Sequence, residues 1–262
     1  MKVGERNKAE ETSDVAPAMA ARLDVVSKLY GNFAALRKLS VEFAVGSSTV
    51  VLGDNGAGKS TLLRMLAGLI APTRGTVSVF GAEPKTHRRR IAYMSHEAML
   101  YDELSALENL RYFARLQAQR GECACGGPER SLRAVGLDPL LKRPVGQYSQ
   151  GMRQRASLAR VLQADPELLL LDEPFSNLDV DSARRMVELL VEFRSWPVIG
   201  ATNVTGAADD QTLRGRTIIL TTHQAHLAEP LAETTLTMRG GAVASMISRA
   251  TSDPAQAKED AR

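Results

Sequence analysis

Apolar and polar residues alternate along much of the first hundred positions, which is the pattern of half-buried β-strands. The alternation begins at Leu23 and is clear at 40–45, and further strand candidates follow at 76–80 and 91–94. Two later runs, 168–171 and 217–221, are continuously apolar. Such runs indicate strands buried on both faces of a parallel sheet, so the pattern predicts an α/β fold.

The spacing of apolar residues becomes helical between about 97 and 165. Ser105 and Glu108 have the spacing of a capping box, and apolar residues then recur near helical spacing from Leu107 to Leu116. The sequence GECACGGP at 121–128 interrupts this pattern, and a second helix is predicted from about Glu129. A helical subdomain at about 97–165 is therefore expected to interrupt the α/β core.

Composition suggests where the folded unit begins and ends. Residues 1–20 are polar and Ala-rich, which is typical of a flexible leader, and 246–262 have the composition of a flexible tail. The domain between them, 21–245, is long enough for one α/β unit with a subdomain. The segment 195–211 is longer than a usual connection, and it is either a surface loop or a partner-docking element.

The net charge and hydropathy of the chain limit the classes of function that we expect. The chain is 44% hydrophobic and 24% charged, as is ordinary for a soluble globular protein. Its net charge of +3 is too small to indicate nucleic acid as the main partner. No run approaches the roughly 18 apolar residues of a membrane span, and the N-terminus has no apolar signal core. We therefore expect a cytoplasmic chain whose membrane role, if any, runs through a partner.

Two smaller features each leave an alternative open. Cys123 and Cys125 have a spacing that suits neither a zinc site nor a redox pair, so free thiols are expected, with a metal or haem contact as the alternative. The basic cluster Arg88–Arg90 is expected to be a solvated edge before the strand at 91–94. Its alternative is a contact with lipid headgroups or nucleic acid.

The sequence GDNGAGKS at 53–60 matches the phosphate-binding pattern G-x-x-x-x-G-K-[ST] between a strand-like and a helix-like run. Its glycines let backbone N–H groups turn toward an anion, and the helix N-terminus adds partial positive charge. Lys59 is predicted to reach the β- and γ-phosphates, and the Ser60 hydroxyl to hold Mg²⁺. The predicted ATP-binding residues here are Gly53, Asp54, Asn55, Gly56, Ala57, Gly58, Lys59, Ser60 and Thr61.

Two carboxylates, Asp172 and Glu173, follow the apolar run at 168–171. The carboxyl ends of strands are where open α/β sheets bind ligands. Asp172 is predicted to bind Mg²⁺, directly or through water, and Glu173 to polarise the attacking water.

A further anion site is suggested by YSQGMRQR at 148–155, which precedes an apolar helix. Ser149 has the position of an N-cap, and Gly151 permits a close backbone approach. On these residues alone, an anion site and a plain helix start remain equal alternatives.

Taken in order, these motifs resemble those of an ATP-binding cassette (ABC) nucleotide-binding domain over about 22–243. The resemblance rests on the phosphate loop, YSQGM at 148–152, LLLLDEP at 168–174, SNLD at 176–179 and His223. It implies an ATPase that requires Mg²⁺. The implied fold is a P-loop NTPase (RecA-like) core with a helical subdomain and a small N-terminal antiparallel β part.

The resemblance also assigns roles outside the phosphate loop. It implies that Tyr30 stacks on adenine, and that His223 contacts the γ-phosphate and positions the water with Glu173. It implies a dimer, expected to be a homodimer, in which one subunit's signature residues reach the nucleotide of the other. These residues are Ser149, Gln150 and Gly151, and Asp179 couples the two sites.

Two departures from the family pattern concern the site. His96 stands where the family usually has the glutamine that links Mg²⁺ and water to the transmembrane partner; it is predicted to take that catalytic place. The signature ends in Met152 rather than glutamine, which removes an amide hydrogen bond. His96, the run at 102–110, SQGMRQR and TTHQ at 221–224 are similar to the haem-exporter ATPase of cytochrome c maturation.

The resemblance therefore implies a peripheral subunit on the cytoplasmic face of a membrane, powering a permease, with haem export as the leading activity and no nucleic-acid partner. Export of another cargo, such as a lipid, drug or peptide, is the first alternative. A soluble ABC ATPase without a transport role, such as a cluster-assembly ATPase, is the second. A P-loop kinase is a third, but it explains neither the signature nor His223.

Overall fold

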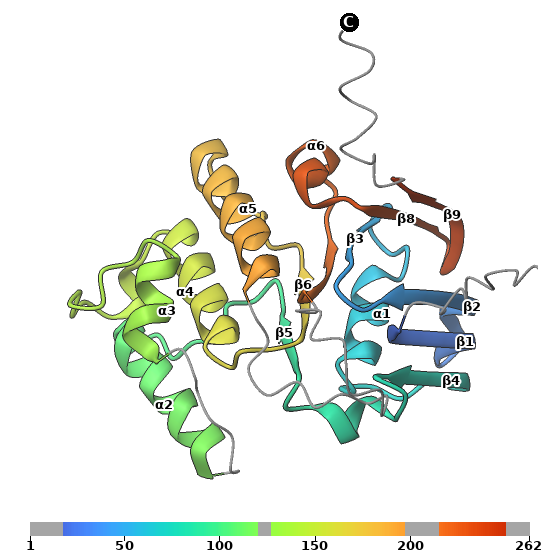
Figure 1. Ribbon diagram of the computed structural model, residues 1–262, viewed down its shortest axis with the longest axis horizontal. Helices are drawn as coiled ribbons and strands as arrows, with labels where there is room; N and C mark the ends of the chain where they lie inside the picture. Colours follow the sequence, from blue (N-terminus) through green and yellow to red (C-terminus); the bar gives the residue numbers. More distant parts are fainter. Residues whose placement is uncertain (1–17, 120–126, 197–214, 250–262) are drawn as a thin grey trace, which may run out of the picture.

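The computed structural model describes residues 18–119, 127–196 and 215–249 (Figure 1). The predictions for Cys123 and Cys125, and for nearly all of 195–211, lie outside these ranges. Six strands form the main sheet in the order β5-β6-β7-β3-β8-β9. All neighbours in it pair in parallel except β8 and β9, which are antiparallel. These strands are β3 (Ser48–Leu52), β5 (Ile91–Met94), β6 (Leu168–Asp172), β7 (Thr217–Thr221), β8 (Thr234–Arg239) and β9 (Ala242–Ser248).

A second, antiparallel sheet lies at the N-terminal part of the chain, in the order β2-β1-β4. Its strands are β1 (Met19–Tyr30), β2 (Phe33–Ala44) and β4 (Arg74–Val79). In Figure 1 it stands beside α1 (Lys59–Leu66) and below β8 and β9. The short 3₁₀ turn η1 (Pro84–His87) leads from it into β5.

A group of helices lies on the far side of the main sheet from the antiparallel sheet (Figure 1). The capping box predicted for the first of them is confirmed: the Ser105 N–H donates to Glu108 Oε2 at 2.8 Å, and the Glu108 N–H donates to Ser105 Oγ at 3.3 Å. The group comprises α2 (Ala106–Gln119), α3 (Pro128–Ala134), η2 (Val145–Gln147) and α4 (Gln150–Leu162). The later elements are α5 (Val180–Ser195), α6 (Ala225–Ala228) and η3 (Glu229–Leu231).

The apolar strand runs are buried on both faces, as predicted. Along β6, Leu169 and Leu171 join a core cluster with residues of α4 and α5, whereas Leu168 and Leu170 join a second cluster with α1 and the antiparallel sheet. Both faces of the strand are therefore covered, and the strand is buried up to its carboxyl end at Asp172. The predicted α/β core with a helical subdomain and an N-terminal antiparallel part is confirmed.

Strands extend past both predicted limits of the domain, because β1 begins at Met19 and β9 runs to Ser248. The first residues of the tail predicted at 246–262 therefore belong to a strand as far as Ser248. Residues 244–248 are exposed, so this edge strand needs no apolar alternation, and its pairing with β8 holds it instead. The solvated-edge prediction also fails at Arg90, which forms a bidentate ion pair with Glu167 and lies 3.7 Å from the centroid of the Phe80 ring.

Candidate functional site

The phosphate loop connects the end of β3 to the start of α1, and two of its glycines are required by their surroundings. Gly58 has a φ of +99°, and a Cβ there would lie 2.6 Å from the Ala35 carbonyl oxygen. Gly53 has a φ of +149°, and a Cβ there would overlap the Met238 carbonyl oxygen. The loop is thus packed so closely against β2 and β8 that its backbone, rather than side chains, faces the site.

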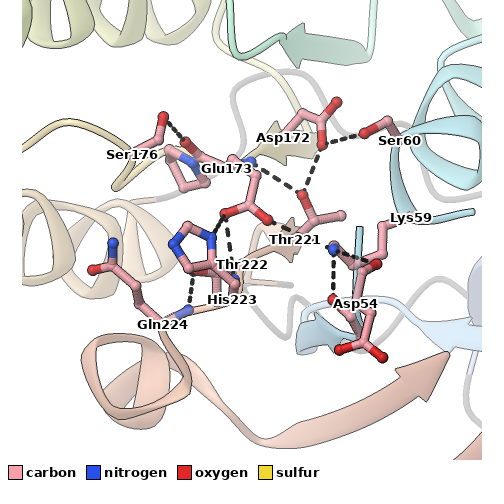
Figure 2. Close-up of polar contacts among 12 residues, drawn as sticks. Asp54, Lys59, Ser60, Asp172, Glu173, Ser176, Thr221, Thr222, His223 and Gln224 are labelled. Atoms are coloured by element: carbon pink, nitrogen blue, oxygen red, sulfur yellow. Dashed lines mark hydrogen bonds and ion pairs between the residues drawn. The ribbon is translucent and has the colours of Figure 1, made fainter. Parts of the chain in front are cut away.

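Lys59 is the first residue of α1, and the loop curls around its side chain. The residue is 6% exposed. Its Nζ donates to the carbonyl oxygens of Gly53 at 2.6 Å and Asp54 at 3.3 Å (Figure 2). The first-turn N–H groups of a helix have no intrahelical acceptors and carry partial positive charge. An ammonium group and free helical N–H groups side by side form a site suited to phosphate.

Asp172 ends β6, is 1% exposed, and is held by hydroxyl groups from three different elements. Its Oδ1 accepts hydrogen bonds from Ser60 Oγ at 2.9 Å and Thr221 Oγ1 at 2.8 Å. Its Oδ2 accepts one from the Tyr93 hydroxyl at 3.2 Å. A buried carboxylate with several donors is satisfied without a basic partner, which leaves it able to bind a cation.

The Ser60 and Asp172 oxygens fit the chemistry of Mg²⁺. This cation prefers oxygen ligands and is usually bound by one or two protein oxygens together with phosphates and water. Ser60 Oγ and Asp172 Oδ1 are 2.9 Å apart and stand beside the phosphate loop. These two residues would hold the metal.

Glu173 follows Asp172 with a φ of +51°, in the left-handed region that few side chains adopt. Its N–H donates to both the Oγ1 and the carbonyl oxygen of Thr221, at 3.0 and 3.1 Å. Its Oε2 lies 2.9 Å from His223 Nδ1 and accepts the His223 N–H at 3.3 Å, and its Oε1 lies 3.8 Å from Lys59 Nζ (Figure 2). Strained residues of this kind cluster at active sites. The carboxylate is thus placed between the phosphate-loop lysine and the histidine.

Sequence reasoning missed Tyr93 and Thr221, which hold the Asp172 carboxylate. Burial raises the pKa of Tyr93, although a hydrogen bond with Arg64 opposes this, so the phenol stays protonated and donates. The Arg64 pKa is raised by the same hydrogen bond. The available signal was positional, since both residues lie on strands that flank β6.

The other predicted residues lie elsewhere. Ser149 caps α4, accepting the Met152 N–H at 3.3 Å, and Figure 1 places α4 among the helices on the left, far from α1. Asp179 caps α5, and its hydrogen bonds from the Ser182 N–H and hydroxyl lower its pKa. Tyr30 and His96 are exposed at the end of β1 and after β5.

No hydrogen bond or ion pair between described residues joins any of the predicted residues Tyr30, His96, Ser149, Gln150, Gly151 and Asp179 to Lys59, Asp172 or Glu173. The chain on its own therefore brings together the phosphate loop, both carboxylates and His223.

Two family models match parts of the chain. The family model described as "ABC transporter" matches residues 36–176, and a model of an AAA domain matches 128–229. ABC transporter ATP-binding protein NatA of Bacillus subtilis is 36% identical over 165 residues, which are 61% of this chain and 67% of that protein. Cytochrome c biogenesis ATP-binding export protein CcmA of Paramagnetospirillum magneticum is 37% identical over 161 residues, 60% of this chain and 74% of that protein.

An import protein is nearly as similar. Sulfate/thiosulfate import ATP-binding protein CysA 2 of Rhizobium meliloti is 33% identical over 233 residues, which are 86% of this chain but 59% of that protein. Among solved structures, a dimeric ATP-binding cassette in a post-hydrolysis state with ADP and Pi has a TM-score of 0.70 at 24% identity, covering 88% of this chain and 99% of that chain. An ATP-binding subunit of an ABC transporter has a TM-score of 0.67 at 27% identity, covering 87% and 90%. The fold is that of these cassettes.

Proposed function

Because the chain belongs to the family of ABC transporter ATP-binding subunits, we propose that it binds ATP with Mg²⁺ and hydrolyses it to drive a transmembrane partner. One observation carries this proposal: the buried Asp172 lies beside Ser60, while the adjacent Glu173 stands between Lys59 and His223. Phosphate-binding, metal-binding and water-activating groups thus meet at one end of the sheet, where such sites are built.

Each group has a defined task in the proposed reaction. Lys59 and the first-turn N–H groups of α1 bind the phosphates. Ser60 and Asp172 would hold Mg²⁺, which would neutralise phosphate charge. Glu173 accepts the proton of the attacking water, and His223 orients that carboxylate and contacts the γ-phosphate. Tyr30 offers an exposed ring for adenine at the end of β1.

A second copy of the chain completes each site. Ser149, Gln150 and Gly151 begin α4 in the helical subdomain, so within one chain they stand apart from α1 (Figure 1). In a homodimer they would contact the γ-phosphate bound by the other copy, with Asp179 between the two sites. Neither half-site is complete alone, so closure of the dimer assembles the reaction and hydrolysis reopens it.

The partner is a transmembrane permease subunit at the cytoplasmic face of a membrane. Within the described ranges, no helix is long and apolar enough to cross a bilayer. The docking surface is the aromatic patch formed by Tyr101, Tyr112 and Phe113. The rings of Tyr101 and Tyr112 pack with centroids 5.1 Å apart, and these two residues are 46% and 40% exposed. Exposed aromatic residues of this kind are typical of interface anchors.

The proposed cargo is haem, exported for cytochrome c assembly. Support comes from His96, SQGMRQR and TTHQ, together with the similarity to CcmA. The import protein CysA 2 and the export protein CcmA are almost equally similar to this chain, so export of another cargo is the main alternative. A soluble ABC ATPase without transport remains the rival from a different class.

Purification of the full chain carrying Glu173→Gln from its native membrane with ATP tests the proposal. The substitution removes the base but keeps the shape of the side chain, so the ATP-bound dimer accumulates. Mass spectrometry then identifies what is bound, with Glu188→Gln on the exposed face of α5 as the matched control. A multi-span protein of the cytochrome c assembly type supports haem. A different multi-span protein supports the transporter and discards haem. Soluble partners alone overturn the transport function.

A further inference from the structure

We infer that Thr221 is a positioning residue that joins the metal-binding Asp172 and the water-activating Glu173 into one rigid unit. The inference rests on the proposed function of these two carboxylates. Thr221 is the last residue of β7, is 0% exposed, and lies directly opposite Asp172 in the parallel register of β6 and β7.

The hydroxyl of Thr221 donates one hydrogen bond and accepts another. Its Oγ1 lies 2.8 Å from Asp172 Oδ1 and 3.0 Å from the Glu173 nitrogen (Figure 2). An N–H can only donate, and an ionised carboxylate can only accept. The direction of both bonds is therefore fixed: the hydroxyl proton points to Asp172, and the oxygen lone pair receives the Glu173 N–H. The Thr221 side chain thus contacts both the Asp172 carboxylate and the backbone of Glu173.

This arrangement matters because Glu173 has a left-handed backbone, with a φ of +51°. Such a conformation persists only where the surroundings fix it. Thr221 supplies both acceptors for the Glu173 N–H, its side-chain oxygen and its carbonyl oxygen at 3.1 Å. The orientation of the Glu173 carboxylate toward His223 and Lys59 therefore depends on Thr221.

The same hydroxyl has a separate effect on Asp172. Ser60 donates to the same Oδ1, but Ser60 is itself the proposed Mg²⁺ ligand. Thr221 and Tyr93 are donors that hold the carboxylate without binding the metal. Outer partners of this kind fix the orientation of metal ligands, and their loss typically costs about 10- to 100-fold in metal affinity or activity.

Three variants of the full chain test the role of the hydroxyl. Thr221→Val keeps the shape but loses the hydroxyl, and Thr221→Ser keeps the hydroxyl. Thr217→Val makes the same change on the same strand, where the lost hydroxyl accepts the Gly46 N–H outside the site. ATP affinity is measured with Mg²⁺ and with EDTA, and kcat and KM are measured for hydrolysis. Thermal melting checks that each variant folds, and Thr221→Ala replaces Thr221→Val if the latter does not.

We expect Thr221→Val to lower the Mg²⁺-dependent gain in ATP affinity and the kcat by about 10-fold or more, and to leave affinity in EDTA unchanged. Thr221→Ser and Thr217→Val should resemble the wild type. Wild-type behaviour of Thr221→Val, or equal losses in Thr221→Ser or Thr217→Val, overturns the inference. A wild-type chain without Mg²⁺-dependent ATP binding would instead contradict the proposed function, so the two failures are distinguishable.

Discussion

The Nδ1 atom of His223 lies 2.9 Å from Oε2 of Glu173, and the backbone N–H of the same histidine donates to that oxygen at 3.3 Å. Two contacts from one residue fix a single carboxylate oxygen. The other oxygen, Oε1, remains 3.8 Å from Lys59. The carboxylate thus lies between Lys59, the proposed phosphate-binding residue, and His223, which follows β7. Changes at Glu173 or His223 are therefore expected to affect hydrolysis more than ATP binding.

Glu173→Gln should abolish hydrolysis while ATP still binds. The amide cannot accept the water proton, and a general base contributes about 10²- to 10⁴-fold to rate. We therefore expect kcat to fall at least about 100-fold with ATP affinity within a few-fold of wild type. Steady-state hydrolysis and equilibrium binding measure the two effects, and Glu188→Gln is the control. A variant that hydrolyses ATP normally would remove Glu173 from the base role.

His223→Ala should lower kcat more than it changes KM, because the variant loses the contact that positions the Glu173 carboxylate as well as the proposed contact with the γ-phosphate. Misplacing a catalytic group by about 1 Å can cost about 10²-fold in rate. His226→Ala is a matched control, since His226 is exposed on α6 three residues later. Equal kcat losses in both variants would point to a general effect of α6 rather than to the Glu173 contact.

Gly58→Ala should disrupt the phosphate loop. A Cβ at this position would meet the Ala35 carbonyl oxygen at 2.6 Å. Two effects could destabilise Gly58→Ala: the strain of a positive φ and the steric overlap of the new Cβ. Gly81→Ala has only the first, because Gly81 has a φ of +81° but a Cβ there would meet no atom of the described residues within 4 Å. Urea unfolding should show a loss of about 1–2 kcal/mol for Gly81→Ala, and about 1–3 kcal/mol more for Gly58→Ala. Only Gly58→Ala should lose ATP binding; equal effects would argue against the packing explanation.

The capping box of α2 should make stability depend on pH. Hydrogen bonds from the Ser105 hydroxyl and N–H lower the pKa of Glu108. A depressed folded-state pKa means that the stabilisation is complete above the unfolded value, roughly 4.3, and is lost as pH falls through the folded value. Glu108→Gln should therefore destabilise the chain at pH 7, with a difference that shrinks toward pH 3. Urea unfolding at both pH values measures this, and Glu103→Gln, an exposed acid before the helix, should show no such trend. A penalty that stays constant with pH would contradict the charge-based explanation.

The sequence predicts most of the fold because its strongest signals are local. The apolar runs at 91–94 and 217–221 coincide with β5 and β7, and the Ser105–Glu108 spacing marks the start of α2. The exposed edge strand β9 was not predicted, because pairing with β8 holds it without a buried face.

The candidate site is predictable in its motifs but not in its supports. Asp172 and Glu173 are recognisable from their place after a buried run. Thr221 is not, because any β-branched residue fits that strand position equally well, and its role depends on the register that sets it opposite Asp172. The same holds for Tyr93, whose hydroxyl reaches Asp172 only because β5 pairs beside β6.

The aromatic patch, which α2 shares with the preceding Tyr101, gives a prediction about the partner that does not involve ATP binding. A double variant, Tyr101→Ser with Tyr112→Ser, removes two exposed rings whose hydroxyls lie 3.4 Å apart. Loss of an aromatic interface anchor typically costs about 2 kcal/mol, which corresponds to about a 30-fold loss of affinity. We expect the membrane partner recovered with the Glu173→Gln chain to fall by about that factor. ATP affinity of the isolated chain should not change.

The control for the patch is Ile247→Ser, which removes an exposed apolar side chain of β9 that is 64% exposed. In Figure 1 β9 and α2 stand at opposite corners of the molecule, so one partner surface that covers α2 leaves β9 free. Full partner recovery in Ile247→Ser and loss in the tyrosine variant would locate the interface at α2. Unchanged recovery in the tyrosine variant would show that the partner docks elsewhere, while the ATP site and its chemistry would stand independently of that result.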